Sequence, residues 1–347
     1  MMKKTQLLSL LLLTVVLLTL IEGVSAHAPL SEEVDNESLD KALVLSDPLK
    51  SWVIYKELHT AGEANYYTFE LEKNAHLTAN LLIPVSEKDT FLPGLIIMGP
   101  GIPNNGTAPS YVQVPNGTHV MVIEGKMPAK ASYEPFTPAS SYFLVDVEMN
   151  VTEKGTYYLV VFDSSSGGKY SLAIGYKEEF TVSEWLLIPF NLISIHLWEG
   201  QNIVLLFAPL FLTILIGIIL IVWKRRQVFK HLPAWTGILG GLLCLGSGLL
   251  TLTQMFYALS IAPDMIALVT LIFAVVPIIL GYVILRTFLK NTEKITRTQR
   301  VVLVICGALG LGIWAGFIVG PVLTILTTFL PFIVILKKKM IPSEKKI

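Results

Sequence analysis

The sequence predicts an α+β multidomain membrane protein, in which an antiparallel, jelly-roll-like β-sandwich precedes an α-helical transmembrane bundle of five spans. Of the 347 residues, 53% are hydrophobic and only 15% are charged, a balance typical of membrane proteins. Short segments rich in β-branched and aromatic residues occupy residues 50–180. Long uncharged apolar runs occupy residues 203–336.

The first 26 residues have the layout of a secretory signal peptide. Lys3 and Lys4 precede the apolar run LLSLLLLTVVLLTLI, and Val24 and Ala26 stand at the small-residue positions of a cleavage site. The apolar run is long for a signal peptide, so an uncleaved anchor is the alternative. Either outcome exports the residues that follow.

The formal net charge of +0 hides an asymmetry along the chain. Residues 27–200 contain 22 Asp and Glu against 10 Lys and no Arg, whereas the residues after 223 contain 14 Lys and Arg. The average charge therefore indicates no nucleic-acid partner. Both cysteines, Cys244 and Cys306, lie in apolar runs, so the acidic segment has no disulfide and its fold must depend on a hydrophobic core.

After an N-terminal extension (27–49), eight short strands are expected, separated by Pro, Gly, Asn and Ser clusters. They are WVIYKEL, NYYTFEL, HLTANLLIP, GLIIMG, HVMVIEG, YFLVDVEM, GTYYLVVFD and KYSLAIGY. GTYYLVVFD is apolar on both faces, which predicts a central strand, and KYSLAIGY is expected beside it after a polar, glycine-containing turn. An antiparallel sandwich accounts for this pattern.

The segments YYTFEL, LTANLLIP, PGLIIMGPG and GTYYLVVFDSSSGGKYSLAIG resemble the bacterial pre-peptidase C-terminal (PPC) domain over about residues 50–176. The last two strands of that family read G-x-Y-Y-hydrophobic, a Gly/Ser turn, then G-x-Y-x-L. The resemblance implies a small jelly-roll-like sandwich that serves as an accessory module of secreted proteins and carries no catalytic residue. This chain departs from the pattern by lacking an adjacent peptidase and by inserting GPGIPNNGTAPSYVQVPNGT.

Several side chains in this region are candidates for modification or contact. Four sequons predict a glycosylated, exported surface, with chance matches as the alternative: Asn36, Asn105, Asn116 and Asn150. Four strand tyrosines favour core packing over an aromatic contact surface: Tyr66, Tyr67, Tyr157 and Tyr158. Three acidic side chains are expected on solvated surface: Asp146, Glu148 and Asp163.

Metal binding is the sharpest chemical hypothesis. Cleavage after Ala26 would leave His27 with a free amine and an imidazole, a pair able to chelate copper. His59, His76 or His119 would complete the site. These histidines show no ligand spacing, so ordinary surface histidines are the alternative. No other cofactor is predicted, and neither a G-x-S-x-G motif nor a Cys/His pair indicates an enzyme.

Residues 181–202 form a juxtamembrane segment. Trp185 and Trp198 flank an apolar stretch that contains Pro189, which suits the headgroup level of a bilayer. A last element packed on the sandwich is an equal alternative.

Five spans are predicted: 203–223, 234–258, 265–285, 301–319 and 321–336. The run Val301 to Leu336 is too long for one helix, and Gly320-Pro321 lies near its middle. Lys and Arg collect on cytoplasmic flanks, so an exported sandwich and a hairpin in the last run place the basic tail (337–347) in the cytoplasm. A re-entrant loop gives the same side for the tail.

Small residues recur at intervals of four in two runs of the bundle. They are Ala308, Gly312, Gly316 and Gly320, together with Gly237 and Gly241. Such spacing places small residues on one helix face and favours close helix packing. The packing is expected inside one chain; a homodimer or another membrane-protein partner is the alternative.

The sequence therefore favours a multi-pass cell-membrane protein that contacts the lipid bilayer, with an extracellular, non-catalytic module for an unknown ligand or partner. The spans contain no deeply placed ionisable residue, which argues against coupled transport. Two alternatives remain: a transport or copper-handling protein whose outer domain captures the metal, and an envelope hydrolase.

Overall fold

The computed structural model describes residues 28–30, 35–225, 232–290 and 295–330. The signal segment 1–26, His27 and the basic tail 337–347 lie outside the described residues. The described residues divide into two compact units, one containing the described residues up to 202 together with 255–269, and the other containing the described residues of 203–254 and 270–330.

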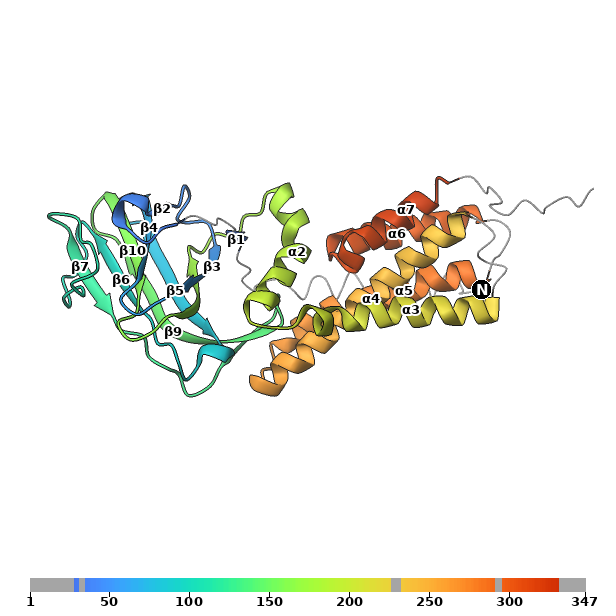
Figure 1. Cartoon of the computed structure of the whole chain (residues 1–347). Helices are drawn as coiled ribbons and strands as arrows, with labels where there is room; N and C mark the ends of the chain where they lie inside the picture. Colours follow the sequence, from blue (N-terminus) through green and yellow to red (C-terminus); the bar gives the residue numbers. More distant parts are fainter. Residues whose placement is uncertain (1–27, 31–34, 226–231, 291–294, 331–347) are drawn as a thin grey trace, which may run out of the picture. The chain divides into compact units, whose positions relative to one another are not determined.

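Two β-sheets form the first unit, which we call the two-sheet domain (Figure 1). The six-stranded sheet has the order β1 (Ala28–Leu30), β3 (Trp52–Leu58), β11 (Gly168–Ile174), β5 (His76–Pro84), β9 (Ala139–Asn150) and β8 (Ser132–Glu134). The five-stranded sheet has the order β2 (Leu43–Val44), β4 (Ala64–Leu71), β10 (Gly155–Phe162), β6 (Gly94–Gly99) and β7 (His119–Ile123). All eight expected strands are present.

The sheets are mixed rather than purely antiparallel. β1 pairs with β3, and β2 with β4, in parallel, and both of these edge strands come from the N-terminal extension. β1, β2 and β8 were not expected, because strands of two or three residues are too short to show an alternating pattern.

The strand β10 lies between β4 and β6, in the middle of its sheet, as its two apolar faces predict. The expected pairing of β10 with β11 is wrong, because β11 lies in the other sheet between β3 and β5. The turn joining them passes from one sheet to the other. The Oδ1 atom of Asp163 organises this turn by accepting hydrogen bonds from the amides of Ser165 (2.7 Å) and Ser166 (3.0 Å). Asp163 is therefore buried and not a solvated surface residue.

One hydrophobic cluster takes side chains from both sheets, including Ile54 and Leu172 from the six-stranded sheet and Leu95 and Leu159 from the five-stranded sheet. A hydroxyl pair joins the sheets inside it, since the Tyr67 and Tyr170 oxygens lie 2.7 Å apart. Asn65 Nδ2 donates to the same Tyr170 oxygen at 2.8 Å. Among the four candidate tyrosines, Tyr158 is half-buried and the other three are buried, which confirms their packing role.

A second cluster covers the opposite face of the five-stranded sheet. Tyr66, Ile96 and Val160 of the sheet pack there with Val112. Val112 belongs to the segment between β6 and β7, residues 100–118. This segment therefore buries an apolar sheet face, which explains why β10 is apolar on both sides.

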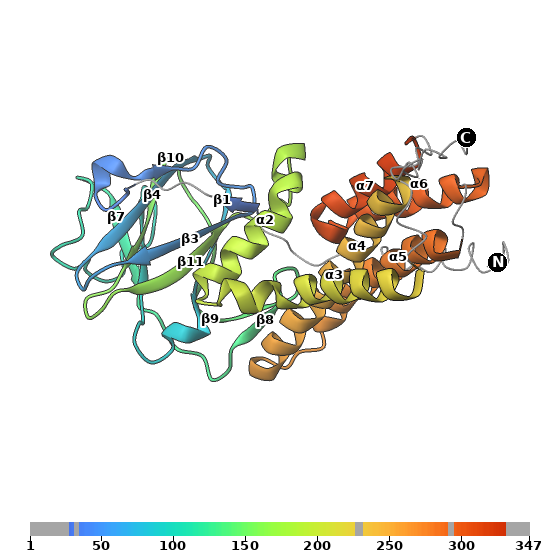
Figure 2. The ribbon, with the colours of Figure 1, turned by 45° about the vertical axis from the view of Figure 1, so that its right-hand side comes forward.

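The helix α2 (Val182–Trp198) packs on the two-sheet domain (Figure 2). Near its start, Glu184 accepts a hydrogen bond from Lys50 Nζ at 2.7 Å. At its end, the Trp198 ring meets the Tyr55 ring edge-on at 4.9 Å. The alternative of a last element packed on this domain is thus observed for α2.

The second unit is helical, and three described helices are long and apolar enough to cross a membrane. They are α3 (Ile203–Arg225), α4 (Leu232–Ile261) and α5 (Ala267–Lys290). The prediction of five spans is wrong for the described residues. Instead of the expected spans 301–319 and 321–336, α6 (Arg297–Gly312) and α7 (Val319–Thr327) have 16 and 9 residues. Residues 331–336 of the last expected span lie outside the described residues. At about 1.5 Å per residue they rise about 24 and 14 Å, less than a hydrocarbon core of about 30 Å.

The helices α6 and α7 pack against each other as a hairpin. Its backbone leaves helical geometry at Trp314, Gly316, Phe317 and Ile318, all with positive φ, earlier than the break expected at Gly320-Pro321. Pro321 is the third residue of α7, a position whose amide needs no partner within the helix. The Ser247 hydroxyl of α4 accepts the Gly316 amide at 2.7 Å and so holds the break in place.

Glycines bring the helices of this unit together. A Cβ added to Gly237 would lie 2.1 Å from the Phe288 ring, and one added to Gly241 would lie 2.9 Å from Leu285. By contrast, Gly312 has no atom within 4 Å of such a Cβ. Because α6 ends at Gly312, the single face expected from the four-residue spacing is interrupted. Ala308 and Gly312 are exposed, whereas the later two members of the set are buried: Gly316 and Gly320.

Candidate metal centre

The turn between β3 and β4 positions a histidine and a glutamate. The Glu63 carboxylate accepts hydrogen bonds from the backbone amides of His59 (2.7 Å) and Thr60 (3.1 Å), which closes the turn. Gly62 adopts a left-handed φ of 80° there, which glycine allows without steric cost. The Gly62 amide also donates to the Asp163 carbonyl at 2.9 Å, so this turn is tied to the β10–β11 turn.

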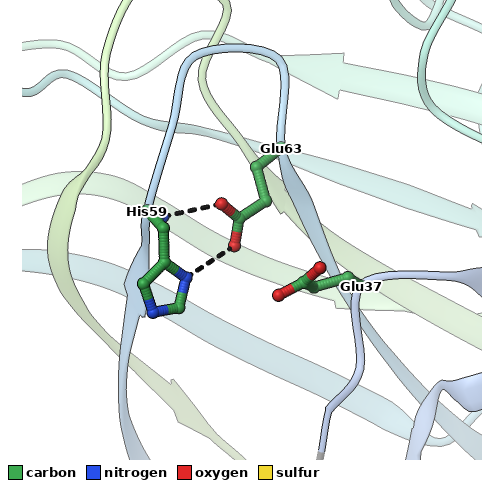
Figure 3. Close-up of side chains that lie close together, drawn as sticks. All are labelled: Glu37, His59 and Glu63. Carbon is green, nitrogen blue, oxygen red and sulfur yellow. Dashed lines mark hydrogen bonds and ion pairs between the residues drawn. The ribbon is translucent and has the colours of Figure 1, made fainter.

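The same carboxylate orients the imidazole. His59 Nδ1 lies 3.2 Å from Glu63 Oε1 (Figure 3), and the other ring nitrogen, Nε2, is directed away from this carboxylate. The Glu63 side chain is 10% exposed and the His59 side chain 69% exposed. A nearly buried carboxylate thus holds an accessible imidazole in one orientation.

A second carboxylate completes the group. Glu37, from the segment before the short 3₁₀ helix Leu39–Lys41, points toward the imidazole (Figure 3). One ligand atom from each of Glu37, His59 and Glu63 lies within 4.8 Å of the others. These residues offer one imidazole nitrogen and two carboxylate oxygens, donor types that zinc and copper accept.

The surroundings of His59 favour its protonated form. The hydrogen bond to Glu63 and the charge of Glu63 raise the pKa of the His59 imidazole above its usual value, and the charges of Glu57 and Glu37 raise it further. Because a metal binds the neutral imidazole, protons compete with the metal for this group.

The other candidate histidines lie elsewhere. His76 Nδ1 lies 3.0 Å from Asn150 Oδ1, and His119 Nδ1 lies 2.9 Å from the Ile102 carbonyl oxygen. The structure therefore does not bring His59, His76 and His119 together, and His27 lies outside the described residues. Sequence reasoning missed Glu37 and Glu63 as ligands; the only signal was a glutamate four residues after a histidine in a polar turn.

The four sequon asparagines differ in solvent accessibility. Asn36 is 1% exposed, and its Nδ2 atom, which would carry a glycan, donates to the Tyr66 carbonyl at 3.0 Å. Asn105, Asn116 and Asn150 are exposed. Only these three present an accessible acceptor in the folded domain.

No protein-family model matches this chain, and no curated protein matches it.

Proposed function

We propose that this protein is a multi-pass cell-membrane protein that carries a non-catalytic binding module outside the cell. The helices α3 and α5, of 23 and 24 residues, and the 28-residue segment Ala234–Ile261 of α4 supply the membrane part. The basic flanks that follow the first and third of these helices favour the cytoplasm. This orientation leaves the two-sheet domain outside, in agreement with the signal-like residues 1–26.

The turn between α4 and α5 supports the same orientation. Residues 255–269 belong to the same compact unit as the two-sheet domain, as expected if both lie on one side of the bilayer. In this topology the α6–α7 hairpin enters and leaves the membrane from the cytoplasmic side, and the tail 337–347 is cytoplasmic.

We further propose that the module is a PPC-like, jelly-roll-like β-sandwich. Two observations support this. The two sheets contribute to one hydrophobic cluster, and most connections between consecutive strands pass from one sheet to the other. Such crossing connections are typical of sandwich folds.

The ligand that the geometry supports best is a divalent copper or zinc ion. The observation that carries this proposal is the convergence of Glu37, His59 and Glu63 within 4.8 Å, with Glu63 fixed by two backbone amides. A site whose carboxylate is already ordered loses less entropy on binding than one on a free side chain.

Calorimetric titration of the full chain in lipid nanodiscs with Cu²⁺ and with Zn²⁺ tests this ligand. We expect one site at neutral pH, lost in His59→Ala and weakened in Glu63→Gln. His76→Ala is the matched control, because the His76 ring, like that of His59, has a polar side-chain partner. Binding that survives in His59→Ala, or that His76→Ala weakens equally, contradicts the site.

The pH dependence is a second test. Because the pKa of His59 is raised, affinity should increase as the pH rises through a value above the ordinary imidazole value of about 6.5. Glu63→Gln removes the charge that favours the imidazolium, so the pKa of His59, followed by NMR, should fall. An unchanged pKa would show that Glu63 does not act on the ring.

Cysteine labelling tests on which side of the membrane the two-sheet domain lies. In a chain with Cys244→Ala and Cys306→Ala, the variant Asn105→Cys should react with a membrane-impermeant maleimide on intact cells. Lys290→Cys should react only after lysis. The reverse pattern would place the two-sheet domain inside and overturn the proposed orientation.

Metal flux separates binding from transport. In reconstituted vesicles the proposed module binds metal without moving it, whereas the transport alternative predicts His59-dependent accumulation. Accumulation of that kind would replace the binding-module proposal.

A further inference from the structure

The helix α2 carries an apolar face that points away from the two-sheet domain. Leu186, Leu187, Phe190 and Leu197 are 41%, 52%, 49% and 37% exposed, and their spacing places them on one side of the helix. Between Glu184 and Glu199 the sequence contains no Asp, Glu, Lys or Arg. An uncharged apolar stripe of this kind indicates a surface that contacts lipid or another protein when the protein functions.

Contacts at both ends of α2 fix the direction of this face. At the start, the Lys50 side chain is only 10% exposed, and its Nζ reaches Glu184 at 2.7 Å while lying 4.1 Å from the centre of the Trp52 ring. At the end, Trp198 Nε1 donates to the Lys56 carbonyl at 3.3 Å. The helix therefore cannot roll to bury the stripe against the domain without losing these contacts.

The opposite face of α2 is buried. Pro189, Ile195 and His196 are buried. The two faces thus have different environments, although both are largely apolar.

The chain leaves α2 close to a membrane-spanning helix. Gly200 has a φ of 92°, and the amides of Gly200 and Gln201 donate to the carbonyls of Leu197 and His196, both at 3.0 Å. This glycine-capped turn ends the helix. Ile203, where α3 begins, follows Trp198 by five residues, which span at most about 18 Å when fully extended.

We propose that α2 lies on the outer surface of the bilayer and inserts the stripe of Leu186, Leu187, Phe190 and Leu197 into the headgroup boundary. Continuity with α3 supports lipid as the occupant, because the end of α2 must lie near the point where α3 enters the membrane. The contacts at the two ends of α2, Lys50 with Glu184 and Trp198 with the Lys56 carbonyl, then hold the two-sheet domain against the membrane surface. This inference rests on the proposed orientation, in which α3 crosses the bilayer and the two-sheet domain lies outside, and not on the metal site.

Site-directed fluorescence on the full chain in phosphatidylcholine nanodiscs tests this proposal. In a chain with Cys244→Ala and Cys306→Ala, an environment-sensitive dye is placed at Leu187→Cys or Phe190→Cys. Glu148→Cys, on the exposed side of β9, is the control. Quenching is measured with iodide in the water and with nitroxide lipids labelled near the headgroup or near the chain end.

At positions 187 and 190 we expect blue-shifted emission, weak iodide quenching and stronger quenching by the headgroup-proximal nitroxide, as for insertion by about 5–10 Å. At position 148 we expect strong iodide quenching only. Iodide quenching at 187 and 190 equal to that at 148 overturns the proposal, because the stripe then faces water. Protection from both iodide and nitroxide lipids also overturns it, because protein, either this chain or a second copy, then covers the stripe.

Discussion

The two units of this protein differ in where their large apolar side chains lie: buried in the interior of the two-sheet domain, but also exposed on the surface of the helical unit. In the two-sheet domain, Leu58, Leu81 and Leu159 are 0% exposed. In the helical unit, Leu205 and Phe211 are 73% and 63% exposed. Apolar burial stabilises a fold only where the surroundings are water, so the difference indicates that water surrounds one unit and lipid the other.

Two glycines from each unit illustrate different backbone conformations. In the two-sheet domain, Gly62 and Gly175 adopt left-handed backbone conformations. In the helical unit, Gly237 and Gly248 are helical, and an added Cβ would lie within 2.5 Å of the Phe288 ring or the Ala274 carbonyl oxygen. Where lipid removes the hydrophobic drive between helices, close backbone approach contributes to association.

The largest expected effect comes from truncating the domain core. Leu159→Ala should lower the free energy of unfolding of the two-sheet domain by about 2–5 kcal/mol, because it leaves a cavity between the sheets. The matched change Leu205→Ala, on the exposed side of α3, should change stability by about 0.5 kcal/mol or less. Urea unfolding of the purified full chain followed by circular dichroism measures both. Equal losses of unfolding free energy in the two variants would contradict the view that apolar burial stabilises the two units differently.

The next effect tests helix packing. Gly237→Ala should destabilise the helical unit by about 1–3 kcal/mol through overpacking against Phe288. Gly312→Ala should leave stability unchanged or raise it, since the added Cβ meets nothing within 4 Å. Thermal unfolding in detergent micelles compares the two. A loss in Gly312→Ala would instead indicate that another chain covers this face, and cysteine crosslinking at 312 would identify it.

Removing a buried hydroxyl should lower stability more in the two-sheet domain than in the helical unit. Tyr170→Phe leaves the Asn65 amide and the Tyr67 hydroxyl without this partner, which should cost about 1–3 kcal/mol. Thr324→Val in α7 should cost less than about 1 kcal/mol, because the Thr324 hydroxyl bonds only the Gly320 carbonyl of its own helix. Tyr176→Phe, at an exposed tyrosine, is the control. Urea midpoints rank these variants, and a larger loss in Thr324→Val would reverse the comparison.

The smallest effect concerns the ion pair that clamps α2. Burial opposes ionisation of Glu184, but hydrogen bonds from Lys50 and Thr181 outweigh it and lower the pKa of the carboxyl. The contribution to stability is therefore present above the ordinary glutamate pKa of about 4.3 and is lost as the pH falls through the lowered value.

Glu184→Gln should weaken protection of the α2 amides by about 1 kcal/mol or less at neutral pH, with no difference from the unmodified chain in stronger acid. Hydrogen exchange measures this protection, and Glu178→Gln at an exposed position is the control. A difference that persists in acid would mean that the ion pair is not the cause.

The candidate site was only partly predictable. His59 stood among the predicted metal ligands, but Glu37 lies 22 positions before it in the chain, and no local pattern relates the two. Asn36 matched a sequon, yet its side chain is buried against Tyr66. Neither outcome can be derived from short-range spacing, because both depend on how the N-terminal extension packs on the five-stranded sheet.

The sequence by itself determined the eight main strands, the central position of β10 and the three long apolar helices. Alternation and run length are local properties that water or lipid imposes directly on each segment. Only the tertiary structure decided that β10 and β11 lie in different sheets, that residues 297–327 form a short hairpin, and that Glu37 meets His59 and Glu63. These features depend on which distant segments cover each apolar face and satisfy each buried polar group, and such choices are made by the folded chain as a whole.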